Sequence, residues 1–236
     1  MSTYVLVHGA WHGMWCWDKV APLLRQAGHR VITFDLPGHG QDKTPVSEVT
    51  LDLYARRVGD VLAEQSEPVI LVGHSMGGVA VSEAAERYPE KVQKLIYLCA
   101  FLLRDGEYLL QYGQKDAGSL ATANLTPDEA GISLSLPKEK LREIFYADCS
   151  EEDIERAVNL VRPQAIQPLN AIIHETAENF GCIPRIYIEC LQDRTISIEC
   201  QRQMYAASPC QKVYTLNSSH APFFSMPEEL TRLLLA

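Results

Sequence analysis

The pentapeptide Gly73-His74-Ser75-Met76-Gly77 carries the strongest chemical signal in this sequence. It follows the apolar run 69–72 directly and opens onto a helix-compatible segment. In that context a Gly-x-Ser-x-Gly turn holds a serine hydroxyl out above a sheet, as a nucleophile requires. Side chains at the flanking positions would clash in so strained a turn, which explains the two glycines. Only three of the five positions are specified, so the case for a nucleophile depends on partners elsewhere in the chain.

Those partners follow two later predicted strands. Asp193 comes after the strand predicted over 185–191, and His220 comes after the strand predicted over 212–216. Since the carboxyl ends of parallel strands meet at one edge of a sheet, we expect both side chains to reach Ser75 there. The chain order Ser, Asp, His is that of the α/β-hydrolase triad.

The chemistry follows from proton affinities. The unperturbed pKa of histidine is about 6.5, so a histidine such as His220 would take the Ser75 proton as the hydroxyl attacks a carbonyl carbon. Asp193 would orient the imidazole and stabilise its charged form. The backbone N–H groups of Ala10, in the loop after the first strand, and of Met76 are the predicted oxyanion donors.

Other residues of the same types offer alternatives to these. Asp35 and Asp105 also follow strands and remain alternative acids, although Asp35 is better explained as the anchor of a turn. The other histidines are interpreted as surface or hydrogen-bonding residues (His12, His29, His39 and His174) or as structural supports of the turn and the oxyanion loop (His8 and His74). The predicted substrate-binding residues are Gly9, Trp11, Phe101 and Phe223.

The elements that would position these residues alternate between short β-branched runs and helical patterns. Strands are predicted over residues 4–8, 30–35, 69–73, 94–100, 185–191 and 212–216. Helices are predicted over residues 15–27, from 51 after the N-cap Thr50, 82–88, 137–147, 151–161 after the N-cap Ser150, and roughly 163–180. This order predicts a doubly wound α/β fold with a mostly parallel sheet of about six strands. Together with the Ser, Asp, His order of the candidate triad, it predicts the α/β-hydrolase fold.

The alternation stops between residues 101 and 184. A stretch of this length without strand alternation predicts a helical lid inserted after the fourth strand. We therefore expect a hydrolase core over residues 1–101 and 184–236, and a lid over residues 102–183.

Composition narrows the function classes. With 30 acidic and 21 basic residues in a chain of 236, the net charge of −9 disfavours nucleic acid as a partner. The longest apolar run, residues 95–103, is far shorter than the roughly 20 residues of a membrane span. Seven scattered cysteines favour neither a disulfide framework nor a zinc site, and a cytoplasmic location is predicted.

Several stretches together resemble one family, the α/β-hydrolase group that contains plant methylesterases and hydroxynitrile lyases. They are His8-Gly9-Ala10-Trp11-His12-Gly13, Leu23-Leu24 with Ala27-Gly28-His29, Gly73-His74-Ser75-Met76-Gly77-Gly78, Leu160-Val161-Arg162-Pro163 and Tyr187-Ile188-Glu189-Cys190. The resemblance spans nearly the whole chain. It implies the triad Ser75, Asp193 and His220, no metal or organic cofactor, and activity on small carboxylic esters or cyanohydrins.

Two positions separate these chemistries. Lyases of the group carry threonine and lysine where this sequence has Gly9 and Ala221, so an esterase is favoured. The residues after His220 also depart from the plant pattern, which indicates a bacterial-type esterase. The leading hypothesis is a serine carboxylesterase that acts on small or hydrophobic esters through an acyl-enzyme. Hydroxynitrile lyase is the alternative enzyme, and a small-molecule receptor on a hydrolase scaffold is the alternative of another class. A homodimer is left open.

Overall fold

The computed structural model describes all residues, Met1–Ala236, and centres on one six-stranded sheet. Its strands are β1 (Thr3–Val7), β2 (Arg30–Thr33), β3 (Val69–His74), β4 (Val92–Leu98), β8 (Arg185–Cys190) and β9 (Lys212–Leu216). The strand order is β2-β1-β3-β4-β8-β9, and every pairing is parallel. The predicted fold class is therefore confirmed. β3 is buried along its whole length, as its unbroken apolar sequence requires.

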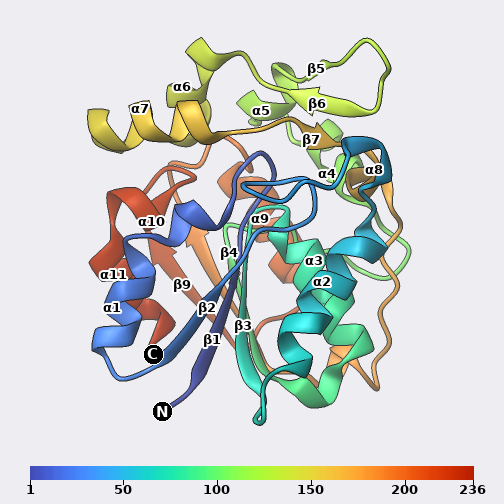
Figure 1. Ribbon diagram of the computed structural model, residues 1–236, viewed down its shortest axis with the longest axis vertical. Coiled ribbons are helices and arrows are strands. Elements are labelled where there is room, and N and C mark those ends of the chain that lie inside the picture. The colour runs from blue at the N-terminus through green and yellow to red at the C-terminus, as the bar shows by residue number, and fades with distance from the viewer.

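Helices cover both sides of this sheet (Figure 1). They are α1 (Val20–Gln26), α2 (Leu51–Ala63), α3 (Gly77–Arg87), α9 (Ile198–Ala207), α10 (Pro222–Ser225) and α11 (Pro227–Leu234). α1 packs against α11 on one side, and α2 packs against α3 on the other. The Thr50 hydroxyl accepts a hydrogen bond from the Leu53 N–H, which confirms the predicted N-cap of α2.

The helix predicted over residues 15–27 is interrupted. Its first part is a 3₁₀ turn, Met14–Trp17, and α1 begins only at Val20. Trp15, Cys16 and Trp17 are all buried, so the tight turn directs three successive side chains into the core, which one face of an α-helix cannot do.

The segment between β4 and β8 lies over the carboxyl edge of the sheet, at the top of Figure 1. Its helices are α4 (Leu109–Lys115), α5 (Leu120–Ala123), α6 (Leu141–Phe145), α7 (Glu151–Leu160) and α8 (Gln167–Asn170). Ser150 accepts a hydrogen bond from the Asp153 N–H and caps α7, as predicted. We call residues 102–183 the inserted segment; its role as a movable lid stays a prediction.

Two expectations for the inserted segment were wrong. It contains a small antiparallel sheet of β5 (Thr126–Pro127), β6 (Ser133–Ser135) and β7 (Gln164–Ala165). The long helix predicted over residues 163–180 is reduced to the single turn α8, with extended chain after it. Glu86 of α3 accepts the backbone N–H groups of Thr176 and Phe180 there, so the core supplies the partners that a helix would otherwise provide.

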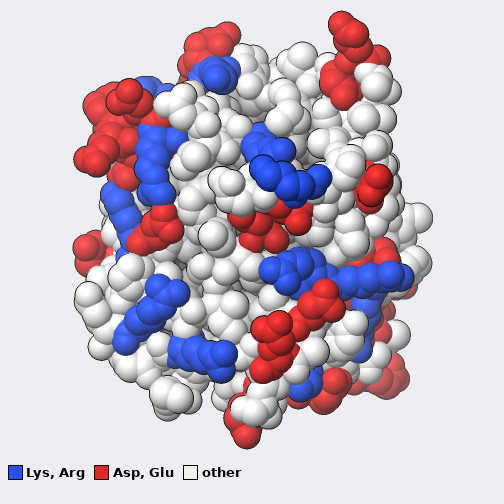
Figure 2. Space-filling model, viewed as in Figure 1, with Lys and Arg blue, Asp and Glu red and all other residues white.

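Charged side chains of both signs are interspersed over the face shown in Figure 2. Two ion pairs join α7 to the chain just before α1. The Lys19 Nζ lies 2.7 Å from Asp153 Oδ2, and Arg156 pairs with Asp18. The Arg156–Asp18 pair is exposed on both sides, and such pairs contribute only about 0–1 kcal/mol. Asp153 is buried, so its pair with Lys19 is the more shielded of the two. None of the helices combines the length and apolarity that crossing a bilayer requires.

Candidate active site

Ser75 stands between β3 and α3 in a backbone conformation that few residues adopt. Its φ is +54°, in the left-handed region, and its side chain is almost completely buried. The Ser75 carbonyl accepts the N–H groups of Gly78 and Phe101 at 3.0 and 3.1 Å, and the Ser75 N–H donates to the Leu98 carbonyl. These bonds to the end of β4 hold the strained turn in place.

The glycines on either side of this turn allow the close approach of other backbone. A Cβ at Gly77 would lie 2.6 Å from the His8 carbonyl oxygen and 2.8 Å from that of Val7. A Cβ at Gly73 would lie 2.8 Å from the Gly77 carbonyl oxygen. Both contacts are shorter than packed atoms tolerate, so glycine is needed at each position, as predicted.

Gly77→Ala is expected to displace the turn from β1 and to cost about 1–3 kcal/mol of stability, together with most of the activity. Urea denaturation and ester turnover measure the two effects. Gly28→Ala is the control: its φ is +88° but nothing lies within 4 Å, so it should cost about 1–2 kcal/mol and leave turnover unchanged. Equal turnover in the two variants would contradict this account of Gly77.

His220 and Asp193 are in direct contact. His220 Nδ1 lies 2.7 Å from Asp193 Oδ2, and both side chains are buried. The alternative acids lie elsewhere. Asp35 accepts the N–H groups of Met14 and Gln41 and so anchors a turn, while the exposed Asp105 pairs with His174. Among the three aspartates weighed, only Asp193 reaches His220.

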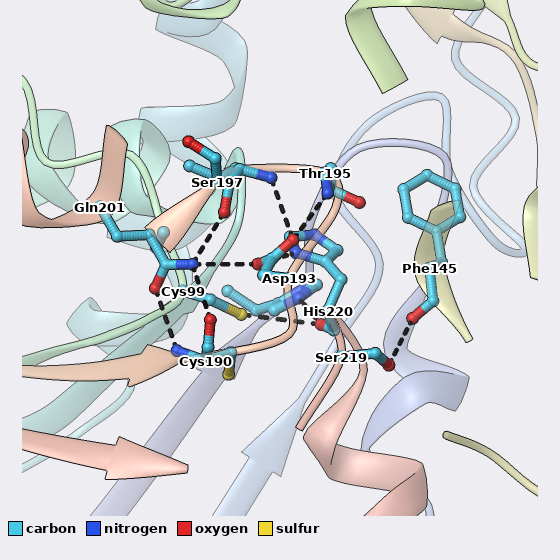
Figure 3. A network of polar contacts seen from close by, with 12 residues as sticks. Cys99, Phe145, Cys190, Asp193, Thr195, Ser197, Gln201, Ser219 and His220 are labelled. Carbon is cyan, nitrogen blue, oxygen red and sulfur yellow. Dashed lines mark hydrogen bonds and ion pairs between the residues drawn. The ribbon is translucent and has the colours of Figure 1, made fainter. Parts of the chain in front are cut away.

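The Asp193 carboxylate is held by four donors (Figure 3). Oδ1 accepts the backbone N–H groups of Thr195 at 2.7 Å and Ile196 at 3.0 Å. Oδ2 accepts the Gln201 side-chain amide at 3.3 Å in addition to His220. Gln201 is fully buried on α9 and was missed by the sequence analysis, because nothing in a single glutamine distinguishes it from a surface residue.

Ser75 is connected to His220 through the intervening residue His74 and not by a direct hydrogen bond. The His220 carbonyl accepts a hydrogen bond from His74 Nε2 at 2.9 Å, so the residue before Ser75 contacts His220. The rings of His74 and His220 are 4.6 Å apart. No hydrogen bond joins the Ser75 hydroxyl to His220 in this structure. Such bonds are often long before substrate binds and shorten in the reacting complex.

The two expected oxyanion donors face the same cleft as Ser75. Ala10, Ser75 and Met76 all line it, and neither the Ala10 nor the Met76 backbone N–H has a hydrogen-bond partner within the protein. A Cβ at Gly9 would lie 2.8 Å from the Ser75 Cβ, so the loop after β1 packs directly on the turn. This arrangement leaves two free donors beside one hydroxyl, which suits an oxyanion.

The cleft itself is narrow and mostly apolar. It encloses about 440 Å³ of empty space, its open mouth included. Of the four residues expected to bind substrate, Trp11 and Phe101 line it, whereas Gly9 and Phe223 do not. The remaining lining residues, which the sequence analysis missed, are Leu109, Leu110, Gly113, Ala121, Thr122, Leu125, Leu169 and Thr195. Most of these come from the inserted segment, whose packing leaves no local signal in the sequence.

The prediction that Phe223 contacts substrate was wrong. Its side chain is fully buried and its ring packs at 4.9 Å against His74 and at 5.7 Å against Trp17. It therefore supports the backbone behind Ser75 from within the core. Phe223 follows His220 closely in the chain, but α10 turns its side chain away from the cleft.

The histidines near the site are core residues. His12 and His39, each expected to be a surface or a hydrogen-bonding residue, are 1 % exposed and have the hydrogen-bonding role. Burial lowers the pKa of His8 to about 4 and that of His12 to about 3. It also lowers the pKa values of His39 and His74 well below the usual 6.5. All four rings are therefore neutral at physiological pH and act through hydrogen bonds.

These shifts predict a stability maximum near pH 6.5. Below that value the histidines bind protons in the unfolded state that they cannot bind in the folded state. The free energy of unfolding therefore decreases as the pH is lowered below about 6.5. Glu175 has the opposite effect, because burial raises its pKa to about 8 and it binds a proton on folding between about pH 8 and 4.5. Its stabilisation is lost as the pH rises through about 8.

Urea denaturation between pH 5 and 9 measures both limbs. We expect the free energy of unfolding to rise by about 2 kcal/mol from pH 9 to 6.5 and to fall below that, where the four histidines outweigh one carboxyl group. Glu175→Gln should remove the alkaline limb and keep the acid limb. A stability that is flat or increases from pH 6.5 to 9 in the wild type would contradict the assignment to Glu175.

One group of side chains could in principle hold a metal ion. Ligand atoms of His74, Cys99 and His220 lie within 4.8 Å of one another. His74 Nε2 and the Cys99 thiol are, however, directed at the His220 carbonyl, at 2.9 and 3.6 Å. Burial raises the pKa of Cys99 well above its usual value, and a protonated thiol is a poor ligand. These residues fit a hydrogen-bonded cluster better than a metal site.

Comparison with known proteins agrees with this geometry. A sequence model of the alpha/beta hydrolase family matches residues 4–233. The chain belongs to this family. Methylesterase 9 of Arabidopsis thaliana is 34% identical over 250 residues, which cover 100% of the chain and 97% of that protein. The pyrethroid hydrolase of Sphingobium wenxiniae is 37% identical over 246 residues, covering 99% and 86%.

A solved alpha/beta hydrolase structure resembles this one closely. The pyrethroid hydrolase from Sphingobium faniae superposes with a TM-score of 0.90 at 34% identity, covering 99% of this chain and 96% of that one. The similarity therefore includes the inserted segment as well as the core. The predicted resemblance to methylesterases is confirmed, and a bacterial relative stands beside the plant ones.

Proposed function

We propose that this alpha/beta hydrolase is a serine carboxylesterase that cleaves small or hydrophobic esters through an acyl-enzyme. The proposal depends on the buried His220–Asp193 pair at 2.7 Å, together with a serine at φ +54° whose preceding residue, His74, contacts the His220 carbonyl. The names of the relatives, a methylesterase and a pyrethroid hydrolase, support ester hydrolysis.

Each residue has a role in this proposal. Substrate binding brings the Ser75 hydroxyl into contact with His220 Nε2, which takes the proton as the oxygen attacks the ester carbonyl. Asp193 holds Nδ1–H and stabilises the imidazolium. The N–H groups of Ala10 and Met76 receive the oxyanion. His220 then protonates the leaving alkoxide, and water attacks the acyl-enzyme by the same steps in reverse.

The cleft supports hydrophobic substrates in particular. Its walls are aliphatic and aromatic, with Ser75, Thr122 and Thr195 as the only hydroxyl-bearing residues among them. Burying apolar surface contributes about 25 cal/mol per Å², so acyl groups that fill the cleft should bind better than acetyl. Trp11 and Phe101 are the proposed aromatic contacts of the substrate.

A substrate panel tests the proposal. We expect a burst of 4-nitrophenol from the acetate ester, followed by slower turnover, and a kcat/KM that rises with acyl length until the cleft is filled. Methyl esters of aromatic acids should also be cleaved. Cyanide release from mandelonitrile at a rate above that of the esters would instead favour a lyase. Tight binding of an ester without turnover would favour a receptor.

A further inference from the structure

One short stretch of the inserted segment contacts all three loops that carry the proposed catalytic groups. We call residues 144–148, at the end of α6, the clamp segment. The loops are the oxyanion loop after β1, the acid loop after β8 and the base loop after β9. Such convergence is not explained by covering a cleft, because none of the clamp residues lines it.

The contact with the oxyanion loop runs through His12. Its Nδ1 lies 2.8 Å from the Ala10 carbonyl oxygen, and its Nε2 lies 2.8 Å from the Tyr146 hydroxyl. A carbonyl can only accept, so neutral His12 donates from Nδ1, and Tyr146 must donate to Nε2. Burial raises the pKa of Tyr146 well above its usual value, so this donor keeps its proton. Tyr146 thereby orients the residue that bears an oxyanion donor.

The contact with the base loop runs through Ser219, the neighbour of His220. The Asp148 carboxylate accepts the Ser219 backbone N–H at 3.0 Å and also the Ser219 hydroxyl. That hydroxyl lies 3.1 Å from the Phe145 carbonyl oxygen (Figure 3). The Phe145 ring packs 5.7 Å from the His220 imidazole. The clamp segment therefore contacts both the backbone just before His220 and the imidazole ring of His220.

The contact with the acid loop completes the set. The Thr195 hydroxyl donates to the Ile144 carbonyl at 3.0 Å, and the Thr195 N–H is one of the donors to Asp193. Residues 144, 145, 146 and 148 thus contact the three loops that carry the proposed oxyanion donor, base and acid.

We propose that the clamp segment positions the catalytic loops, with Tyr146 and Asp148 as positioning residues for the oxyanion loop and the base loop. The inference rests on the ester hydrolysis proposed above. Complete loss of an oxyanion donor costs about 10²–10³ in turnover. Tyr146→Phe would loosen Ala10 without removing its N–H, so its effect should be smaller.

The test compares Tyr146→Phe and Asp148→Asn with two matched variants that lie in the inserted segment but outside the clamp segment. Tyr112→Phe removes a hydroxyl that bonds only to Glu107, and Asp128→Asn alters a carboxylate that accepts only the N–H groups of residues 132 and 133 in its own hairpin. Burst amplitude gives the concentration of active sites, so kcat refers to folded enzyme alone. We expect kcat to fall about tenfold in the two clamp variants, with KM within twofold of wild type, and no change in the controls.

Hydrogen exchange provides a readout that needs no activity. Peptides over residues 9–13 should exchange faster in Tyr146→Phe, and those over 217–221 faster in Asp148→Asn, with the controls unchanged. Unaltered kcat per active site and unaltered exchange in both clamp variants would overturn the proposal, as would equal losses in the controls. If the wild type cleaves no ester, the proposed function fails while the exchange data still decide whether the clamp orders these loops.

Discussion

Turnover of a chromogenic ester is expected to fall by about 10⁶ when Ser75 is replaced by alanine, because removing the nucleophile of a serine hydrolase has an effect of that order. The burst should disappear with it, since no acyl-enzyme can form. Stopped-flow absorbance with the acetate ester measures both. The substitution removes a single oxygen atom, so the variant should keep the melting temperature of the wild type.

Ser47→Ala is the matched control for this change, because Ser47 is exposed and far along the chain from the turn. It should retain full turnover and the full burst. If Ser75→Ala still cleaves the ester within about tenfold of the wild-type rate, Ser75 is not the nucleophile and the proposed active site is wrong.

Asp193→Asn is expected to lower kcat by about 10⁴ while leaving the fold in place. The amide keeps the shape of the carboxylate but can present its NH₂ to His220 Nδ1, which favours the tautomer that cannot accept the Ser75 proton. It also removes the negative charge opposite the imidazolium. Steady-state kinetics between pH 6 and 9 provide the measurement.

Substitutions of two other aspartates are controls that distinguish the orienting role of Asp193 from a general effect of losing a negative charge. Asp105→Asn should be neutral, because that carboxylate is exposed and pairs with His174. Asp35→Asn should lower stability through its turn without a comparable loss of kcat. A greater loss of kcat in either than in Asp193→Asn would reassign the acid.

The core could be predicted from the sequence because its signals are local. The apolar run 69–72 reads as a buried strand whatever surrounds it, and Thr50 and Ser150 cap helices through bonds within three residues. Each of the six predicted strands is present, with ends displaced by no more than two residues.

The inserted segment was harder to predict because its structure depends on distant partners. β7 is two residues long and exists through pairing with β6, about thirty positions earlier. The chain after α8 is extended because Glu86, far away on α3, accepts its N–H groups. Neither of these distant contacts produces a hydrophobic periodicity in the local sequence from which it could be predicted.

The candidate site shows the same division. Ser75, Asp193 and His220 could be singled out because strand ends converge in a parallel sheet. Whether a side chain points into the cleft or away from it depends on packing, which explains why Phe223 was misplaced and Gln201 overlooked. The sequence could not decide between a surface and a hydrogen-bonding role for His12, because its partner Tyr146 lies more than a hundred residues later in the chain.

The aliphatic walls of the cleft bear on how the reaction ends. Hydrolysis turns a neutral ester into an acid that is anionic at neutral pH, and no lysine or arginine lines the cavity to receive it. An unpaired carboxylate is costly to keep in such surroundings. The newly formed charge should therefore drive the acid out into water, so that accumulated product competes poorly with fresh substrate.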